Sequence, residues 1–164
     1  MICLPAGKVG GRWDMSSDAV ANALAYLAAH HVLTLATTGP EGVWVAAVFY
    51  VNDQFDLYFL SAGHTRHGQN LAQNGNAAAT IQEDYHDWPS IQGVQLEGEV
   101  TQLSGEAQEA AIRLYQTKYP FVSLENPAIG PALAKVNWYR LRPRRLYFID
   151  NRLGLGHRDE INTR

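Results

Sequence analysis

One stretch of 31 residues restricts the fold of this chain most strongly: residues 31–61, HVLTLATTGPEGVWVAAVFYVNDQFDLYFLS. Its runs of β-branched and aromatic residues are typical of strands. The runs are separated at residues 38–42 and 52–54 by Gly, Pro, Asn and Asp, which favour turns. Three short strands joined by two short turns form a hairpin-connected series. The stretch therefore predicts a three-stranded antiparallel meander.

More strands follow in the rest of the chain. Residues 77–82 form another β-rich run, and residues 93–103 alternate apolar and polar side chains with the period of a half-exposed strand. The last strands are expected at VNWYRLRP and RRLYFID, with a break at Pro143, and residues 151–164 resemble a loop. Helical spacing is found at residues 18–30 and 106–118, and a short helix is expected within residues 126–135. Six or seven strands with two or three peripheral helices predict a mainly β fold, a small antiparallel barrel.

Length and composition narrow the class of protein. A chain of 164 residues suits one domain, so we expect residues 1–164 to form a single unit with residues 1–15 as an extended arm. The net charge of −3 argues against general nucleic-acid binding. No apolar run is long enough for a membrane span, and no signal peptide is evident. A single cysteine, Cys3, cannot form an internal disulfide, which favours a cytoplasmic location.

The segment SAGHTRH, residues 61–67, is a candidate anion site. Ser61 and Thr65 carry hydroxyl groups, Arg66 carries a planar cation suited to phosphate oxygens, and His67 has a ring N–H. A helix beginning near Thr65 would add its own N–H groups. The alternative interpretation is a solvated loop with a helix cap, and composition alone favours it.

Other kinds of site have less support. His64 and His67 form an H-x-x-H pair, but a metal site needs a third ligand that the sequence does not bring near. The segment EDYHDW, residues 83–88, is explained better by solvated charges. There is no G-x-S-x-G elbow and no glycine-rich nucleotide fingerprint. The sequence therefore names no nucleophile and no catalytic residue.

The order of these features resembles the pyridoxamine 5′-phosphate oxidase-like superfamily, the FMN-binding split barrels. The resemblance is carried by HVLTLATTGPEGVWVAAVFYV, LYFLSAGHTRH, NLAQNGNAAATI and IQGVQLEGEVTQL. It implies a split β-barrel, a homodimer with FMN between the subunits, and a small-molecule substrate oxidised or reduced by the flavin. The cofactor-binding positions that it implies are Val48, Phe49, Tyr50, Leu60, Ser61, Thr65, Arg66, His67, Gln92, Trp138 and Asn151.

Two departures from the family pattern concern charge. The family's phosphate-binding pair is typically Arg-Lys, whereas this chain has Arg66-His67, and Val45 stands where the family has an Arg. These differences imply weaker or pH-sensitive FMN binding and make vitamin B6 oxidation a poor expectation. Two alternatives on the same barrel stay open. One is a non-enzymatic or haem-binding or haem-degrading module, with His157 or His64 as the haem ligand, and the other is a deazaflavin-dependent reductase.

Overall fold

The computed structural model describes residues 15–123 and 125–163. Its elements, in chain order, are α1 (Met15–Ala29), β1 (Val32–Gly39), β2 (Gly42–Asp53), β3 (Asp56–Ala62), α2 (Arg66–Gln73), β4 (Asn76–Gln82), β5 (Gln92–Gln102), α3 (Gly105–Lys118), α4 (Gly130–Leu133), β6 (Val136–Asp150), the 3-10 turn η1 (Asn151–Leu153) and β7 (Arg158–Glu160). The arm expected at residues 1–15 lies outside the described residues except for Met15, which begins α1.

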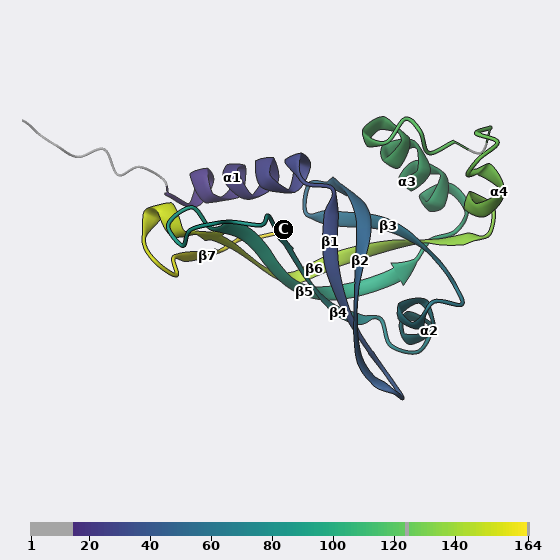
Figure 1. Ribbon diagram of the computed structural model, residues 1–164, viewed down its shortest axis with the longest axis horizontal. Coiled ribbons are helices and arrows are strands. Elements are labelled where there is room, and N and C mark those ends of the chain that lie inside the picture. Colours follow the sequence, from purple (N-terminus) through teal and green to yellow (C-terminus); the bar gives the residue numbers. More distant parts are fainter. Residues whose placement is uncertain (1–14, 124, 164) are drawn as a thin grey trace, which may run out of the picture.

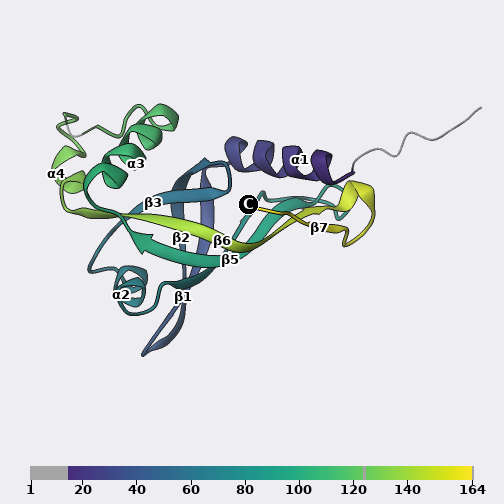
Figure 2. The same ribbon diagram turned by 180° about the vertical axis from the view of Figure 1, so that it is seen from behind.

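Six strands close into an antiparallel barrel. The strand order is β3-β2-β1-β4-β5-β6, and β3 also pairs with β6, so the first and last strands meet. The seventh strand, β7, lies outside the barrel and pairs with β6 alone. Figures 1 and 2 show the helices around this barrel, with α1 at one side and α3 and α4 at the end of the molecule farthest from η1 and β7. The mainly β, six- to seven-stranded fold predicted from the sequence is therefore confirmed.

The barrel is filled from alternate positions on each strand. Leu33 and Leu35 of β1 are fully buried, whereas their neighbours on the same strand are half-buried or exposed. The same period of two appears in β5, where Val94 and Leu96 point inward. Helix α1 packs Leu27 onto this core, and the Tyr50 hydroxyl donates to the Leu27 carbonyl at 2.7 Å. Burial and this hydrogen bond fix α1 across the barrel.

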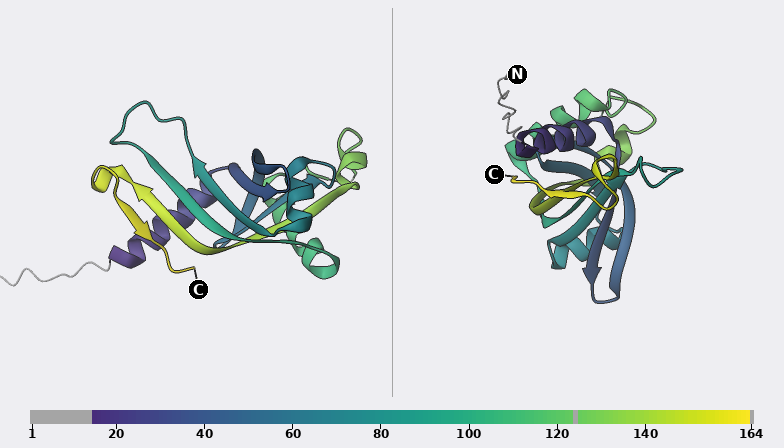
Figure 3. Two further views of the ribbon diagram at one scale, coloured as in Figure 1. Left: turned by 90° about the horizontal axis from the view of Figure 1, so that it is seen from below. Right: turned by 90° about the vertical axis from the view of Figure 1, so that its left-hand side faces the viewer.

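The barrel is split between β2 and β3. Their ladder holds only four residue pairs, from Asp53↔Asp56 to Tyr50↔Phe59. The rest of β2 pairs with β1 along the whole length of β1. As Figure 3 shows, this β1–β2 hairpin extends away from the barrel on the side opposite α1. A second apolar cluster covers the opening that results between β2 and β3. It includes Ala111 and Tyr115 of α3 and Trp138 of β6.

Two local expectations were wrong. Pro143 does not break the last strand, because β6 continues from Val136 to Asp150 with a register shift against β5 between Glu97 and Gly98. The proline sits at this bulge, where a missing N–H donor is tolerated. The segment after residue 150 is not wholly a loop, since it contains η1 and the short strand β7.

Candidate functional site

The loop between β3 and α2 folds as an N-terminal helix cap. Thr65 precedes α2, accepts a hydrogen bond from the backbone N–H of Gly68 at 3.2 Å and donates to the Ala62 carbonyl at 2.8 Å. Gly68 makes this close packing possible, because a Cβ there would lie 2.8 Å from the Ala62 carbonyl oxygen. The helix start expected near Thr65 is confirmed, and its first N–H groups lie beside the hydroxyl groups of the loop.

Ser61, Thr65 and His67 form a polar corner at this cap. The Ser61 hydroxyl lies 2.6 Å from Nε2 of His67 and 3.0 Å from the Thr65 hydroxyl. Ser61 and His67 are both buried, and burial lowers the pKa of His67 below its ordinary value. The corner is therefore a set of neutral donors and acceptors, held together by its own hydrogen bonds.

Arg66 adds a charge at the edge of this corner. Its guanidinium lies over the Trp44 ring, 4.8 Å from the centroid, and its Nη2 donates to the Glu41 carbonyl at 2.8 Å. Its Nε is buried and makes no hydrogen bond among the described residues, although the Glu41 carboxylate forms an ion pair with it at 3.8 Å. An orphaned donor on a guanidinium costs free energy until an acceptor reaches it. Arg66 therefore fits a phosphate group, and the fit does not depend on the family resemblance.

An apolar pocket of about 460 Å³ opens directly from the polar corner. Its floor comes from β2 and β3, its roof comes from α3, α4 and the start of β6, and Ser61 and His67 belong to its wall. The lining residues are Ala47, Val48, Phe49, Leu60, Ser61, His67, Tyr115, Phe121, Val122, Ile129, Ala132, Leu133 and Val136. The site thus combines a polar corner with an apolar chamber, an arrangement suited to a planar molecule that carries an anionic group.

The split in the barrel leaves backbone groups facing this pocket. Tyr50 donates its N–H to the His31 carbonyl at 3.0 Å. The peptide groups of Tyr50 and of every second residue of β2 therefore face β1. By alternation, the peptide groups of Ala47 and Phe49 face the β3 side. The β2–β3 ladder ends at Tyr50↔Phe59, so the N–H of Phe49 and the peptide groups of Ala47 lie beyond it and have no partner in this ladder. They can hydrogen-bond the polar edge of a ring.

The pocket brings together five of the residues expected to bind cofactor: Val48, Phe49, Leu60, Ser61 and His67. Thr65 and Arg66 adjoin them through the contacts described above. Tyr50 is placed differently, because its side chain is fully buried in the barrel and its carbonyl accepts from the Tyr119 hydroxyl at 2.6 Å. Trp138 is also buried behind the roof, where its ring and the Tyr115 ring form a T-shaped pair with their centroids 5.4 Å apart.

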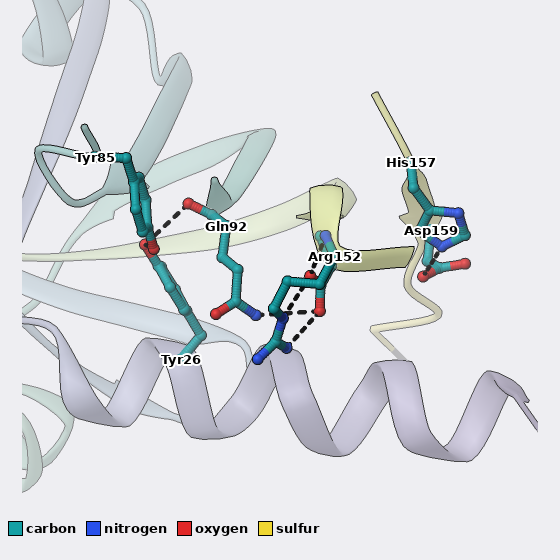
Figure 4. A network of polar contacts seen from close by, with 7 residues as sticks. Tyr26, Tyr85, Gln92, Arg152, His157 and Asp159 are labelled. Atoms are coloured by element: carbon teal, nitrogen blue, oxygen red, sulfur yellow. Dashed lines mark hydrogen bonds and ion pairs between the residues drawn. The ribbon is translucent and has the colours of Figure 1, made fainter. Parts of the chain in front are cut away.

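Gln92 and Asn151 lie at the other end of the same strands. Gln92 pairs with Asp150, whereas Gln102 pairs with Tyr139 next to Trp138, a separation of roughly 30 Å along β5. Figure 4 shows Gln92 beside Tyr26 and Arg152, donating from Nε2 to Asp150 at 3.2 Å. Asn151 donates to the Trp88 carbonyl at 2.8 Å. Within one chain these two residues do not reach the pocket, so their predicted role requires a second copy.

Asp150 holds this distant end together. Its carboxylate is 2% exposed and accepts from Arg152 Nη2 at 2.6 Å. The hydrogen bonds from Arg152 lower the pKa of Asp150, and burial opposes them. Arg152, the partner in this ion pair, is half-exposed. We therefore interpret the cluster as structural support for the turn between β6 and β7. His157 lies nearby and contacts Asp159 at 2.9 Å.

The structure gives no support to a metal site. Among the described residues, no group of three His, Cys, Asp or Glu side chains is placed to hold a metal ion. His64 is exposed on the loop, while His67 points inward to Ser61. The two histidines of the H-x-x-H pair therefore face different surroundings.

Sequence reasoning missed two contributors to the site. The contact of Trp44 with Arg66 depends on the β1–β2 hairpin bending toward α2, which no spacing in the sequence indicates. Tyr115 lies in the helix expected at residues 106–118 and lines the pocket, a role that the helical spacing does not indicate. No local motif marks either residue.

An antiparallel barrel split between two strands, with a polar corner at the opening, defines the split-barrel class. The chain belongs to the pyridoxamine 5′-phosphate oxidase family, whose model matches residues 19–150. A UPF0306 protein of Photorhabdus laumondii is 34% identical over 134 residues, covering 80% of this chain and 87% of that protein.

Two solved structures share the fold. A haem-binding protein of Mycobacterium smegmatis gives a TM-score of 0.71 at 23% identity, covering 90% of this chain and 58% of that one. The haem storage protein HutZ of Vibrio cholerae gives a TM-score of 0.62 at 17% identity, covering 74% of this chain and 88% of that protein. At these identities the likeness concerns the fold alone. In the part of the chain that the structure describes, no helix is long and apolar enough to cross a membrane.

Proposed function

We propose that this protein binds FMN as a homodimer and acts as a flavin-dependent oxidoreductase on a small molecule in the cytoplasm. The observation that carries the proposal is the polar corner of Ser61, Thr65 and His67, flanked by Arg66, at the mouth of an apolar pocket. The corner would bind the FMN phosphate, and the pocket would hold the ring. Membership of the pyridoxamine 5′-phosphate oxidase family supports the same cofactor.

The protein's own contribution to the reaction would be binding and orientation. FMN, when bound, supplies the two-electron redox chemistry. Arg66 would hold the phosphate through its orphaned Nε. The peptide groups of Ala47 and Phe49 would orient the ring edge, and the roof of α3 and α4 would exclude water.

The homodimer is supported by apolar side chains on the outer face of the β1–β2 hairpin. Val43, Val45 and Phe49 are each more than half exposed, and Phe49 also lines the pocket. A second copy packed on this face would bury these side chains and complete the pocket wall. In that assembly Gln92 and Asn151 of one chain could reach the pocket of the other.

The absorption spectrum of the purified protein tests the proposal in one step. We expect a yellow protein with flavin bands, or an apoprotein that quenches the fluorescence of added FMN with micromolar affinity. A colourless protein that does not quench FMN would show the proposal to be wrong. The cofactor that co-purifies also separates FMN from a deazaflavin, which fits the same pocket shape.

Haem is the second candidate, since the two solved structures named above are haem-binding or haem storage proteins. The ligands expected for it, His64 and His157, do not line the apolar pocket. The one histidine that does, His67, has its Nε2 in a hydrogen bond with Ser61. FMN is therefore the better supported cofactor, and a Soret band on adding haemin that is lost in His64→Ala or His157→Ala would reverse this order.

A further inference from the structure

The roof of the pocket contains one polar side chain, Tyr115. The other roof residues, Phe121, Val122, Ile129, Ala132, Leu133 and Val136, are apolar. Tyr115 comes from α3 and is 3% exposed, with its ring held between Trp138 at 5.4 Å and Tyr119 at 4.7 Å. These ring contacts hold the Tyr115 side chain in place in the wall of the pocket.

The Tyr115 hydroxyl makes no hydrogen bond within residues 15–123 and 125–163. The neighbouring tyrosines behave differently: the Tyr119 hydroxyl donates to the Tyr50 carbonyl at 2.6 Å, and the Tyr50 hydroxyl donates to Leu27 at 2.7 Å. A hydroxyl that makes no hydrogen bond within its own chain is free to donate to a ligand. Burial also raises the pKa of Tyr115, so its hydroxyl keeps its proton and is available as a donor.

Away from the corner flanked by Arg66, the pocket offers nothing to balance a charge on a ligand. None of its lining residues is Asp, Glu, Lys or Arg, and the only titratable side chains among them are His67 and Tyr115. His67 belongs to the corner assigned to the phosphate. A charged group under the roof would lose its hydration without gaining a counter-ion, which is strongly unfavourable.

We propose that the space under α3 and α4 binds a neutral, planar aromatic molecule whose carbonyl-type oxygen accepts a hydrogen bond from Tyr115. The inference rests on the proposed function, because this molecule would be the substrate lying beside FMN. It excludes phosphorylated and carboxylated substrates from this part of the pocket. Tyr115 is thereby a specificity-determining residue.

Three naphthalene derivatives test the proposal by equilibrium dialysis against the FMN-saturated protein. In 2-acetylnaphthalene the ring carries a neutral acceptor, 2-ethylnaphthalene lacks the acceptor, and 2-naphthoate carries a charge. We expect the ketone to bind best and the carboxylate at least about ten-fold more weakly, since its charge is desolvated. Tyr115→Phe should weaken the ketone about five-fold, the effect of one ordinary hydrogen bond, and leave 2-ethylnaphthalene unchanged.

Tyr147→Phe is the matched control, because Tyr147 is half-buried on β6 and packs against Arg158, away from the pocket. It should leave all three affinities unchanged. The inference would be overturned if the ketone and the carboxylate bound with equal affinity. It would also be overturned if Tyr115→Phe lowered the affinities for the ketone and for 2-ethylnaphthalene equally. A Tyr115→Phe variant in which FMN affinity falls instead would overturn it as well, since Tyr115 would then contact the cofactor. Failure of the wild-type protein to take up FMN would instead refute the proposed function.

Discussion

Arg66 is the residue on which the phosphate assignment depends most directly. Its guanidinium is already oriented by the Trp44 ring and the Glu41 carbonyl, so little side-chain entropy remains to be lost on binding. Its Nε is buried and makes no hydrogen bond, and its charged neighbour, the Glu41 carboxylate, lies 3.8 Å away. A phosphate oxygen would satisfy this Nε and add a charge-assisted hydrogen bond.

We therefore expect Arg66→Ala to weaken FMN binding by roughly one to two decades, from the loss of about 1.5–3 kcal/mol. Riboflavin, which lacks the phosphate, should bind both proteins almost equally. Fluorescence titration measures both affinities. Arg113→Ala, on the exposed face of α3, is the control and should change neither. An unchanged FMN affinity in Arg66→Ala would mean that the loop has another role.

His67 makes the stability of the protein depend on pH. Burial lowers its pKa, so the folded protein favours the neutral ring. The unfolded chain takes up a proton near the ordinary histidine pKa of about 6.5. Below that value the unfolded state binds more protons than the folded state, and the free energy of unfolding decreases as the pH falls.

Removing the imidazole should remove this contribution. We expect the midpoint of thermal unfolding to fall less between about pH 7.5 and about pH 5.5 in His67→Gln than in the wild type. The control His86→Gln, on an exposed loop, should retain the wild-type dependence. The interpretation of His67 fails if both variants follow the wild-type curve.

At the scale of the elements, the β5–β6 pair shows why the last strand bends without breaking. Gly98 faces the β6 backbone so closely that an added Cβ would lie 2.2 Å from the Arg142 carbonyl oxygen. Gly98→Ala must therefore displace one strand, and we expect a loss of about 1–3 kcal/mol in the free energy of unfolding, measured by urea denaturation. Gly63→Ala, which meets only the flexible Asn137 amide, should cost much less. Equal costs would mean that the bulge accommodates a side chain.

The same pair of strands marks the limit of what the sequence could predict. Alternation in residues 93–103 and turn residues at 38–42 predicted strands correctly, because both signals are local. Pro143 wrongly predicted a break, because its tolerance depends on the bulge beside it in β6, where Arg144 has no partner in β5. The helix cap at residues 61–67 was predictable because its hydroxyl groups and the start of α2 are adjacent in sequence. The place of Tyr115 in the pocket was not predictable, because only the tertiary packing of α3 brings this residue into the same pocket as Ser61 and His67.

At the scale of the whole molecule, the β1–β2 hairpin carries apolar side chains that a monomer would leave exposed to water. It extends from the barrel (Figure 1). Val43, Val45 and Phe49 on it are exposed, and Phe49 also lines the pocket. Exposed apolar patches of this kind mark interaction sites. A homodimer that buries this face would link assembly to cofactor binding, because the pocket wall continues into the same surface.

Val43→Asp separates these effects, since Val43 is 71% exposed in the single chain and does not line the pocket. We expect the wild type to have about twice the mass of one chain by light scattering and Val43→Asp to be monomeric, because burying two like charges in the interface is unfavourable. Its far-ultraviolet circular dichroism should be unchanged, while its affinity for FMN should fall. Ala25→Asp, on the exposed side of α1, is the control and should remain dimeric. A monomeric wild type that binds FMN tightly would separate the cofactor site from assembly, and the pocket of one chain would then be sufficient.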